Sequence, residues 1–207
     1  MPGAGFEVSR PPRTAQQSSG LRRGREGVLA AATALFRTRG YDATSMGDIA
    51  EHAGVTKAAL YRHVSSKAEL LHAVTGPMRA AVLTLLGSSA QARDRGVDML
   101  AGLLRGLADV AADDPAGHAL LWATRGTPAG DDRDSACREA VFRRLVDLLE
   151  QAVAEGDIRD DIAPRLIARL LLGAVAGANC LPGEPVSPSR SAVDALFGGL
   201  RPTSVAG

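Results

Sequence analysis

Residues 44–63 read TSMGDIAEHAGVTKAALYRH, and this segment says most about how the chain folds. It has the internal spacing of two short helices that cross each other closely. A small residue, Ala50, stands where the helices would touch, and four residues later Gly54 can supply the positive φ that a tight turn needs. Leu60, six residues further on, would point back into the core. Because these requirements are met together, the segment predicts a helix-turn-helix.

The rest of the chain also has a helical pattern. Apolar residues recur at three- and four-residue intervals on both sides of the motif, and Ser66 with Glu69 forms a Ser-x-x-Glu capping box that would open a long helix. Residues 125–134 and 182–188 have the composition of loops, and no segment alternates as a strand does. We therefore expect an all-α fold of about nine helices. The expected helices cover residues 25–40, 45–53, 57–63, 66–87, 97–112, 116–124, 135–155, 164–178 and 189–200.

The overall composition is that of a globular protein. Hydrophobic residues make up 45% of the chain and charged residues 23%, while the low aromatic content of 3% favours helix over strand. Cys137 and Cys180 have no further Cys or His at a metal-ligand spacing. The N-terminus lacks an apolar signal-peptide core, and no run of about 18 apolar residues is present to span a bilayer. We expect a cytoplasmic protein without a membrane segment, a metal or a cofactor.

Charge is distributed unevenly along the chain. Residues 1–67 carry ten Lys and Arg against five Asp and Glu, whereas residues 68–207 carry fourteen against eighteen. This asymmetry indicates an anionic partner for the first segment. An arginine cluster at positions 22, 23 and 25, with Arg10 and Arg13, fits either a solvated tail or a flexible arm in a DNA minor groove. We favour the solvated tail.

The second helix of a helix-turn-helix enters the DNA major groove with its N-terminal residues forward. Thr56 and Lys57 stand at that end, where a hydroxyl and an ammonium group can bind phosphate. Tyr61 and His63 lie on the side away from Leu60, and Ala58 is small enough to allow a close approach. These side chains are the candidate DNA contacts.

Residues 25–71 resemble the DNA-binding domain of the TetR (tetracycline-repressor-like) family. The shared features are Phe-x-x-x-Gly-Tyr at 36–41, Thr44, Ile-Ala-x-x-Ala-Gly-Val at 49–55, Leu-Tyr-x-His at 60–63 and Ser-Lys-x-Glu-Leu at 66–70. The resemblance implies Thr44 and Lys67 as further DNA contacts, beside Thr56, Lys57, Tyr61 and His63. Val64 and Ser65 depart from the family pattern, which usually has an aromatic residue and a proline there.

The same resemblance implies a second, helical domain that binds an effector and forms a homodimer. The expected organisation is a disordered arm over residues 1–21, a DNA-binding domain over 22–68, an effector-binding and dimerisation domain over 69–201, and a disordered tail over 202–207. Five residues of the second domain are candidates to line an effector cavity, although each also fits an ordinary core. They are Met99, His118, Trp122, Cys137 and Phe142.

A candidate dimer face lies near the C-terminus. Gly173 and Gly177, four residues apart, would permit another helix to approach closely. Leu170, Ala174 and, in the last predicted helix, Leu196 complete the candidate interface. A two-fold dimer would present its two recognition helices about 34–36 Å apart, which matches successive major grooves.

The sequence thus predicts a sequence-specific transcriptional repressor that a small-molecule effector releases from a palindromic operator. The alternative is a helical ligand-binding or scaffold protein that keeps the helix-turn-helix only for its structure. We expect no enzyme activity, because the chain has no Gly-rich phosphate loop, paired catalytic carboxylates or nucleophile elbow.

Overall fold

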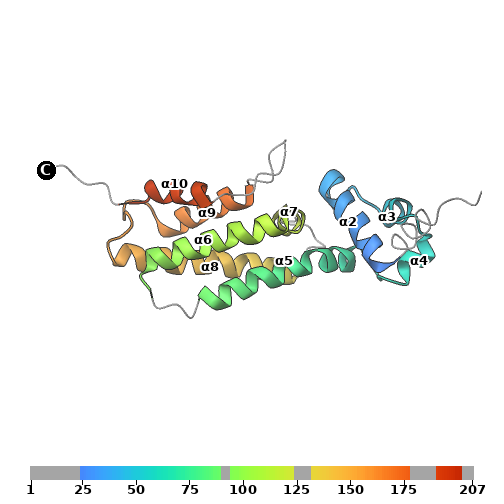
Figure 1. The fold of residues 1–207 in the computed structure, drawn as a ribbon, viewed down its shortest axis with the longest axis horizontal. Helices are drawn as coiled ribbons and strands as arrows, with labels where there is room; N and C mark the ends of the chain where they lie inside the picture. The colour runs from blue at the N-terminus through green and yellow to red at the C-terminus, as the bar shows by residue number, and fades with distance from the viewer. Residues whose placement is uncertain (1–23, 90–93, 124–131, 178–189, 202–207) are drawn as a thin grey trace, which may run out of the picture.

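The fold is seen in a computed structural model that describes residues 24–89, 94–123, 132–177 and 190–201. Within these ranges the chain forms helices and no strands, as predicted, in an elongated arrangement (Figure 1). The predicted arm, tail and 182–188 loop, and Cys180, lie outside the described residues. The helices are α2 (Arg25–Arg39), α3 (Met46–Ala53), α4 (Lys57–Tyr61), α5 (Lys67–Ser89), α6 (Gly96–Asp113), α7 (Pro115–Ala123), α8 (Asp132–Ala154), α9 (Pro164–Gly177) and α10 (Arg190–Gly198).

Local sequence signals set most of the helix ends. Gly40 closes α2 with a φ of 84°, and Gly54 closes α3 in the left-handed region with a φ of 68°. Pro164 opens α9 at the first helical position, where its missing N–H has no cost. A capping box that we did not predict opens α3: Ser45 and Asp48 each bond the other's backbone N–H.

The apolar side chains form two cores. One joins α2, α3 and α4 to the first turns of α5, and it includes the fully buried Ile49 and Leu60. The other, larger core lies among α5, α6, α7, α8 and α9. Leu120 of α7 packs into the first core, and α5 supplies buried residues to both. The long α5 therefore connects the two ends of the molecule (Figure 1).

By length and composition alone, α5 would also be long and apolar enough to cross a membrane. In this structure it packs against α2, α6, α7 and α8. The helix therefore contributes buried side chains to both cores of the fold.

Three predictions about the helices need correction. The helix α4 ends at Tyr61, two residues before the predicted end, because the chain turns so that Val64 enters the first core. At the start of α5, Ser66 caps Glu69 as expected, but the Glu69 carboxylate accepts from the N–H and hydroxyl of Ser65 instead of from Ser66. The helix α8 begins at Asp132, inside the predicted 125–134 loop.

Candidate nucleic-acid interface

The turn between α3 and α4 fixes how α4 is presented. The N–H of Gly54 bonds to the carbonyls of Ala50 and Glu51, and the N–H of Val55 bonds to Ala50 at 2.9 Å. Ala50 is buried where the two helices meet, and Leu60 anchors α4 with no exposed surface. With one face held in the core, the opposite face of α4 is left on the surface.

Four of the predicted DNA contacts lie on this open face: Thr56, Lys57, Ala58 and Tyr61 are all exposed, Tyr61 with 52% of its surface. The Thr56 oxygen caps α4 by accepting the N–H of Ala59 at 3.1 Å, which leaves its own O–H to donate elsewhere. The four residues thus offer a hydroxyl, an ammonium group and a phenol around one small residue.

The side chain of Lys57 lies across α3. A methyl group added at Gly47 would come within 3.0 Å of Lys57 Cε and 3.2 Å of its Nζ. Hydrogen bonds from Ser45 hold the pKa of Asp48 below its ordinary value, and the charges of Arg39 and Lys57 act in the same direction. Because Gly47 has no side chain, the Lys57 side chain can pack closely against α3.

Two of the predicted DNA contacts, Thr44 and Lys67, make hydrogen bonds inside the fold. Thr44 is buried, and its hydroxyl bonds to the carbonyl of Gly40 at 2.7 Å. The Lys67 ammonium bonds to the carbonyls of Tyr41 and Thr44 at 2.8 and 2.9 Å, and it lies 4.3 Å from the centre of the Tyr41 ring. These residues therefore hold the loop between α2 and α3, and their DNA contacts stay predictions. His63 is half-buried, and its DNA contact stays a prediction.

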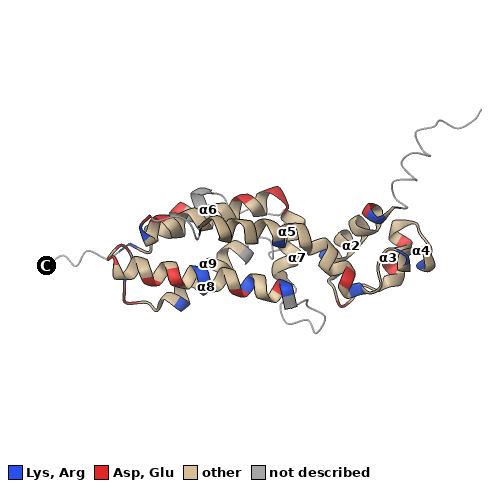
Figure 2. Cartoon of the chain, turned by 90° about the horizontal axis from the view of Figure 1, so that it is seen from below, with Lys and Arg blue, Asp and Glu red and all other residues tan. Residues whose placement is uncertain are grey.

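Two further cations stand at this end of the molecule. Arg39 in the last turn of α2 and Arg62 at the end of α4 are both exposed. The basic last turn of α2 was the sequence signal that could have found Arg39. Figure 2 shows basic and acidic residues side by side on α2 to α4. This mixture arises because residues 1–23, with four Arg and one Glu, carry more than half of the positive excess of residues 1–67.

The candidate effector residues do not gather around one described cavity. Trp122 and Cys137 belong to the larger core, with Phe142 packed against it. Met99 lines a small cavity between α5 and α6 that the other four candidates do not line. His118 is buried, with its ring centre 6.1 Å from that of Trp122. Most of these residues serve as ordinary core in the described part of the chain, and burial raises the pKa of the Cys137 thiol.

Burial lowers the pKa of His118 to about 4, against the opposing charge of Asp114. As the pH falls, the His118 imidazole takes up a proton near pH 6.5 in the unfolded chain but only near pH 4 in the folded chain. We expect the free energy of unfolding to fall by about 3 kcal/mol as the pH drops through this window. Urea unfolding of the wild type and His118→Gln at several pH values measures the difference. An equal pH dependence in both proteins would contradict the prediction.

The candidate dimer face is largely open. Leu170 exposes 64% of its surface, Leu196 exposes 39%, and Gly173 and Ala174 are exposed beside Leu170. A Cβ added at Gly173 would meet nothing within 4 Å. Gly177 is the last residue of α9, and its surroundings lie outside the description.

An exposed second helix, a left-handed glycine in the turn and a buried anchor define a helix-turn-helix protein with a helical second domain. Residues 28–74 match the family model described as bacterial regulatory proteins, tetR family. A TetR-family regulator from Streptomyces coelicolor, SCO3833, has a similar solved structure, with 31% identity and a TM-score of 0.69 over 84% of this chain and 90% of that one. The chain belongs to the TetR family.

Curated relatives give the same picture over shorter spans. The transcriptional activator FasR of Mycolicibacterium smegmatis is 53% identical over 47 residues, which are 23% of this chain and 22% of FasR. The regulator Rv1816 of Mycobacterium tuberculosis is 33% identical over 130 residues, 58% of this chain and 54% of that protein. The chain thus matches about a fifth of FasR and about half of Rv1816.

Proposed function

We propose that this chain is a cytoplasmic transcriptional repressor whose homodimer binds a palindromic operator and leaves it when a small molecule binds. The observation that carries the proposal is the open face of α4, where Thr56, Lys57 and Tyr61 are exposed together. Leu60 and Gly54 hold that face in place from below. The role requires no catalysis.

Lys57 and Tyr61 suit backbone recognition. A lysine binds phosphate as a point charge, and a phenol or hydroxyl donates a hydrogen bond to a phosphate oxygen. Such contacts fix the position of the protein on DNA, while base edges supply sequence choice. Arg39 and Arg62, exposed at the same end, would add to the electrostatic attraction.

The proposed dimer rests on the apolar face of α9. Leu166 and Leu170, one turn apart, expose 51% and 64% of their surfaces, which is costly for a monomer in water. Gly173 and Ala174 continue the face with small residues that allow close packing. Sedimentation of the chain as a monomer at micromolar concentration would contradict this part of the proposal.

The proposed effector response is consistent with two proteins of similar fold. AibR was crystallised with isovaleryl coenzyme A and operator DNA, and it shares the fold at 23% identity and a TM-score of 0.69. A γ-butyrolactone receptor is 27% identical with a TM-score of 0.60. In this chain α5 supplies residues to both cores, so a change in the larger core has a direct route to the DNA-binding end.

The test is a double variant, Lys57→Ala with Tyr61→Ala, titrated against DNA from the region upstream of the gene. A dimer would lose four backbone contacts, and we expect affinity to fall by about 100-fold at moderate salt. Loss of two lysines should also reduce the slope of log affinity against log salt by about 2. Fluorescence anisotropy at three salt concentrations gives both quantities.

Arg143→Ala is the matched control, because it removes an exposed charge from α8 and should leave DNA affinity unchanged. If the double variant binds as tightly as the wild type, the chain is instead a ligand-binding or scaffold protein that keeps the motif for its fold. The same DNA placed before a reporter gene gives the direction of control. If the protein is a repressor, the double variant should raise expression of the reporter. If it is an activator, the double variant should lower expression.

A further inference from the structure

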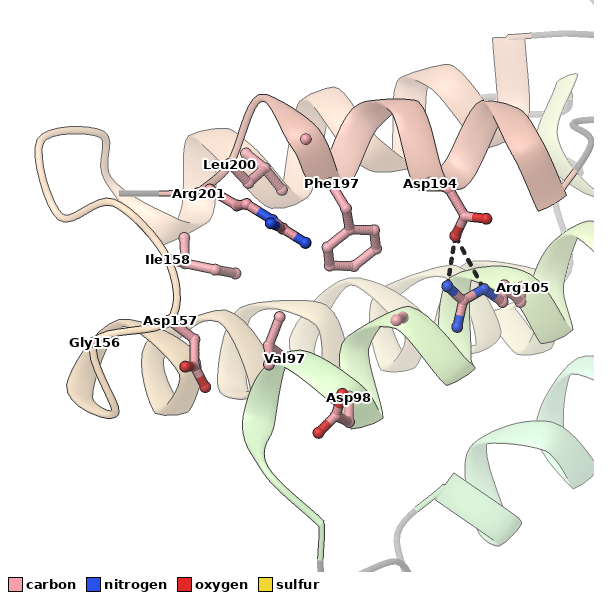
Figure 3. A pocket seen from close by; sticks show the side chains of 12 residues that line it. Val97, Asp98, Arg105, Gly156, Asp157, Ile158, Asp194, Phe197, Leu200 and Arg201 are labelled. Carbon is pink, nitrogen blue, oxygen red and sulfur yellow. Dashed lines mark hydrogen bonds and ion pairs between the residues drawn. The ribbon is translucent and has the colours of Figure 1, made fainter. Parts of the chain in front are cut away.

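A cavity of about 870 Å³ lies under α10, at the end of the molecule opposite α2 to α4 (Figures 1 and 3). Its walls come from the first turns of α6, from the loop after α8 and from the end of α10. Three segments far apart in the sequence therefore build it. None of the five candidate effector residues lines it.

Apolar side chains line one part of the cavity, among charged residues at its edges. Val97 of α6, Ile158 of the loop and Phe197 of α10 point toward one another across it, with Leu200 beside them (Figure 3). Ile158 is buried, while Val97, Phe197 and Leu200 are half-buried and pack against the larger core. These side chains offer a surface for the hydrocarbon or aromatic part of a ligand.

Four of the charged residues around the cavity are accounted for. Arg105 is ion-paired with Asp194 across one side of the opening. Asp157 is held by Arg95 at 2.7 Å and points away from the interior, and Asp98 also points away (Figure 3). None of these carboxylates is therefore placed to pair with a positive charge inside the cavity.

Arg201 differs from the others. Its guanidinium points toward Phe197 at the cavity (Figure 3), and it makes no hydrogen bond or ion pair with any described residue. A planar guanidinium with five donors is suited to a carboxylate or another oxyanion. The interior thus combines one uncommitted cation with an apolar floor.

The end of α10 is fixed over this floor by two ties. The Arg105–Asp194 pair joins α10 to α6, and the N–H of Arg159 donates to the carbonyl of Leu200 at 3.0 Å. Between these ties α10 spans the cavity as a strap. Leu196, on the same helix, belongs to the proposed dimer face, so a ligand under α10 would press directly on a helix of that face.

We propose that this cavity binds a small organic anion with an apolar body. The acid group pairs with Arg201, and the body lies against Val97, Ile158 and Phe197. This site uses no residue of the DNA interface and none of the five candidate effector residues. Ligand binding here goes beyond the proposed function, and it can be tested without DNA.

The probe is 8-anilinonaphthalene-1-sulfonate, an aromatic sulfonate that fluoresces in apolar sites. We expect about one site per chain, with the dissociation constant raised about tenfold by Arg201→Gln. Ala101→Trp places a large ring in the cavity and should abolish the site. Decanoate should displace the probe, and neutral 1-decanol should do so at least tenfold less well.

The controls are Arg37→Gln, an exposed arginine at the other end of the molecule, and Ala80→Trp, on the exposed side of α5. Both should bind the probe as the wild type does, and circular dichroism verifies that each variant is folded. Binding that survives Ala101→Trp, or that both controls lose equally, would overturn the site. Loss with Ala101→Trp but unchanged affinity with Arg201→Gln would overturn the anionic ligand class. Because Arg201 is exposed, its variant keeps the test valid even if Ala101→Trp fails to fold.

Discussion

Arg79→Met is expected to lower the free energy of unfolding by about 3–5 kcal/mol. The Arg79 guanidinium is ion-paired with the carboxylate of Asp134, whose side chain is 1% exposed. Thr75 donates a further hydrogen bond to the same carboxylate at 2.8 Å. Without the arginine, the buried negative charge would keep, among the described residues, one hydroxyl as a hydrogen-bond partner. Desolvation of that charge is the cause of the large loss.

Urea unfolding followed by circular dichroism measures this loss. The double variant Arg79→Met with Asp134→Leu should recover most of the stability, because it removes both charges and leaves Thr75 bonded to the carbonyl of Leu71. Arg143→Met is the matched control, since Arg143 pairs with Glu139 on the exposed side of α8 at 3.8 Å. That surface pair should contribute less than about 0.5 kcal/mol. A loss below about 1 kcal/mol in Arg79→Met would show that water reaches Asp134.

The same ion pair bears on how the two cores communicate. Lys67 at the start of α5 clamps the loop between α2 and α3, and Arg79, twelve residues later, joins α5 to the first turn of α8. The helix is therefore tied to the DNA-binding end at one point and to the larger core at another. A ligand that displaced α8 would pull on α5 through Arg79.

The turn of the helix-turn-helix could be predicted because it depends on neighbouring residues. Gly54 needs only its own φ and the spacing to Ala50 and Leu60, so the turn could be predicted from the motif. The role of Lys67 inside the fold could not be predicted, because its partner carbonyl at Tyr41 is 26 residues away. Contacts of that kind are made by the tertiary fold and leave no local pattern.

The larger core also depends on contacts between residues far apart in the sequence. Asp134 stands in a run of charges that reads as a solvated loop, yet it is buried against a partner 55 residues away. Trp122 and Cys137 have the chemistry of a ligand cavity and of a core alike, so residue type alone could not separate the two. The cavity under α10 is built by segments that no spacing rule connects.

Gly96→Ala is expected to destabilise the fold by about 3 kcal/mol, although the substitution adds one methyl group to a helix. Gly96 is buried at the first turn of α6, against α8. A Cβ there would lie 2.7 Å from the backbone nitrogen of Ala152 and 3.1 Å from its Cα. Those atoms belong to the last turn of α8, where Ala152 is fully buried, so α6 and α8 would have to separate.

Separation would also break the bond from the N–H of Gly96 to the Glu155 carboxylate, which is 2.8 Å long. Gly102→Ala is the control on the same helix, because a Cβ at Gly102 meets nothing within 4 Å. Alanine is the better helix former, so that change should stabilise the fold by about 0.5–1 kcal/mol. Urea unfolding of the two variants should therefore give shifts of opposite sign. If Gly96→Ala unfolded at the same urea concentration as the wild type, the close packing of α6 on α8 would be wrong.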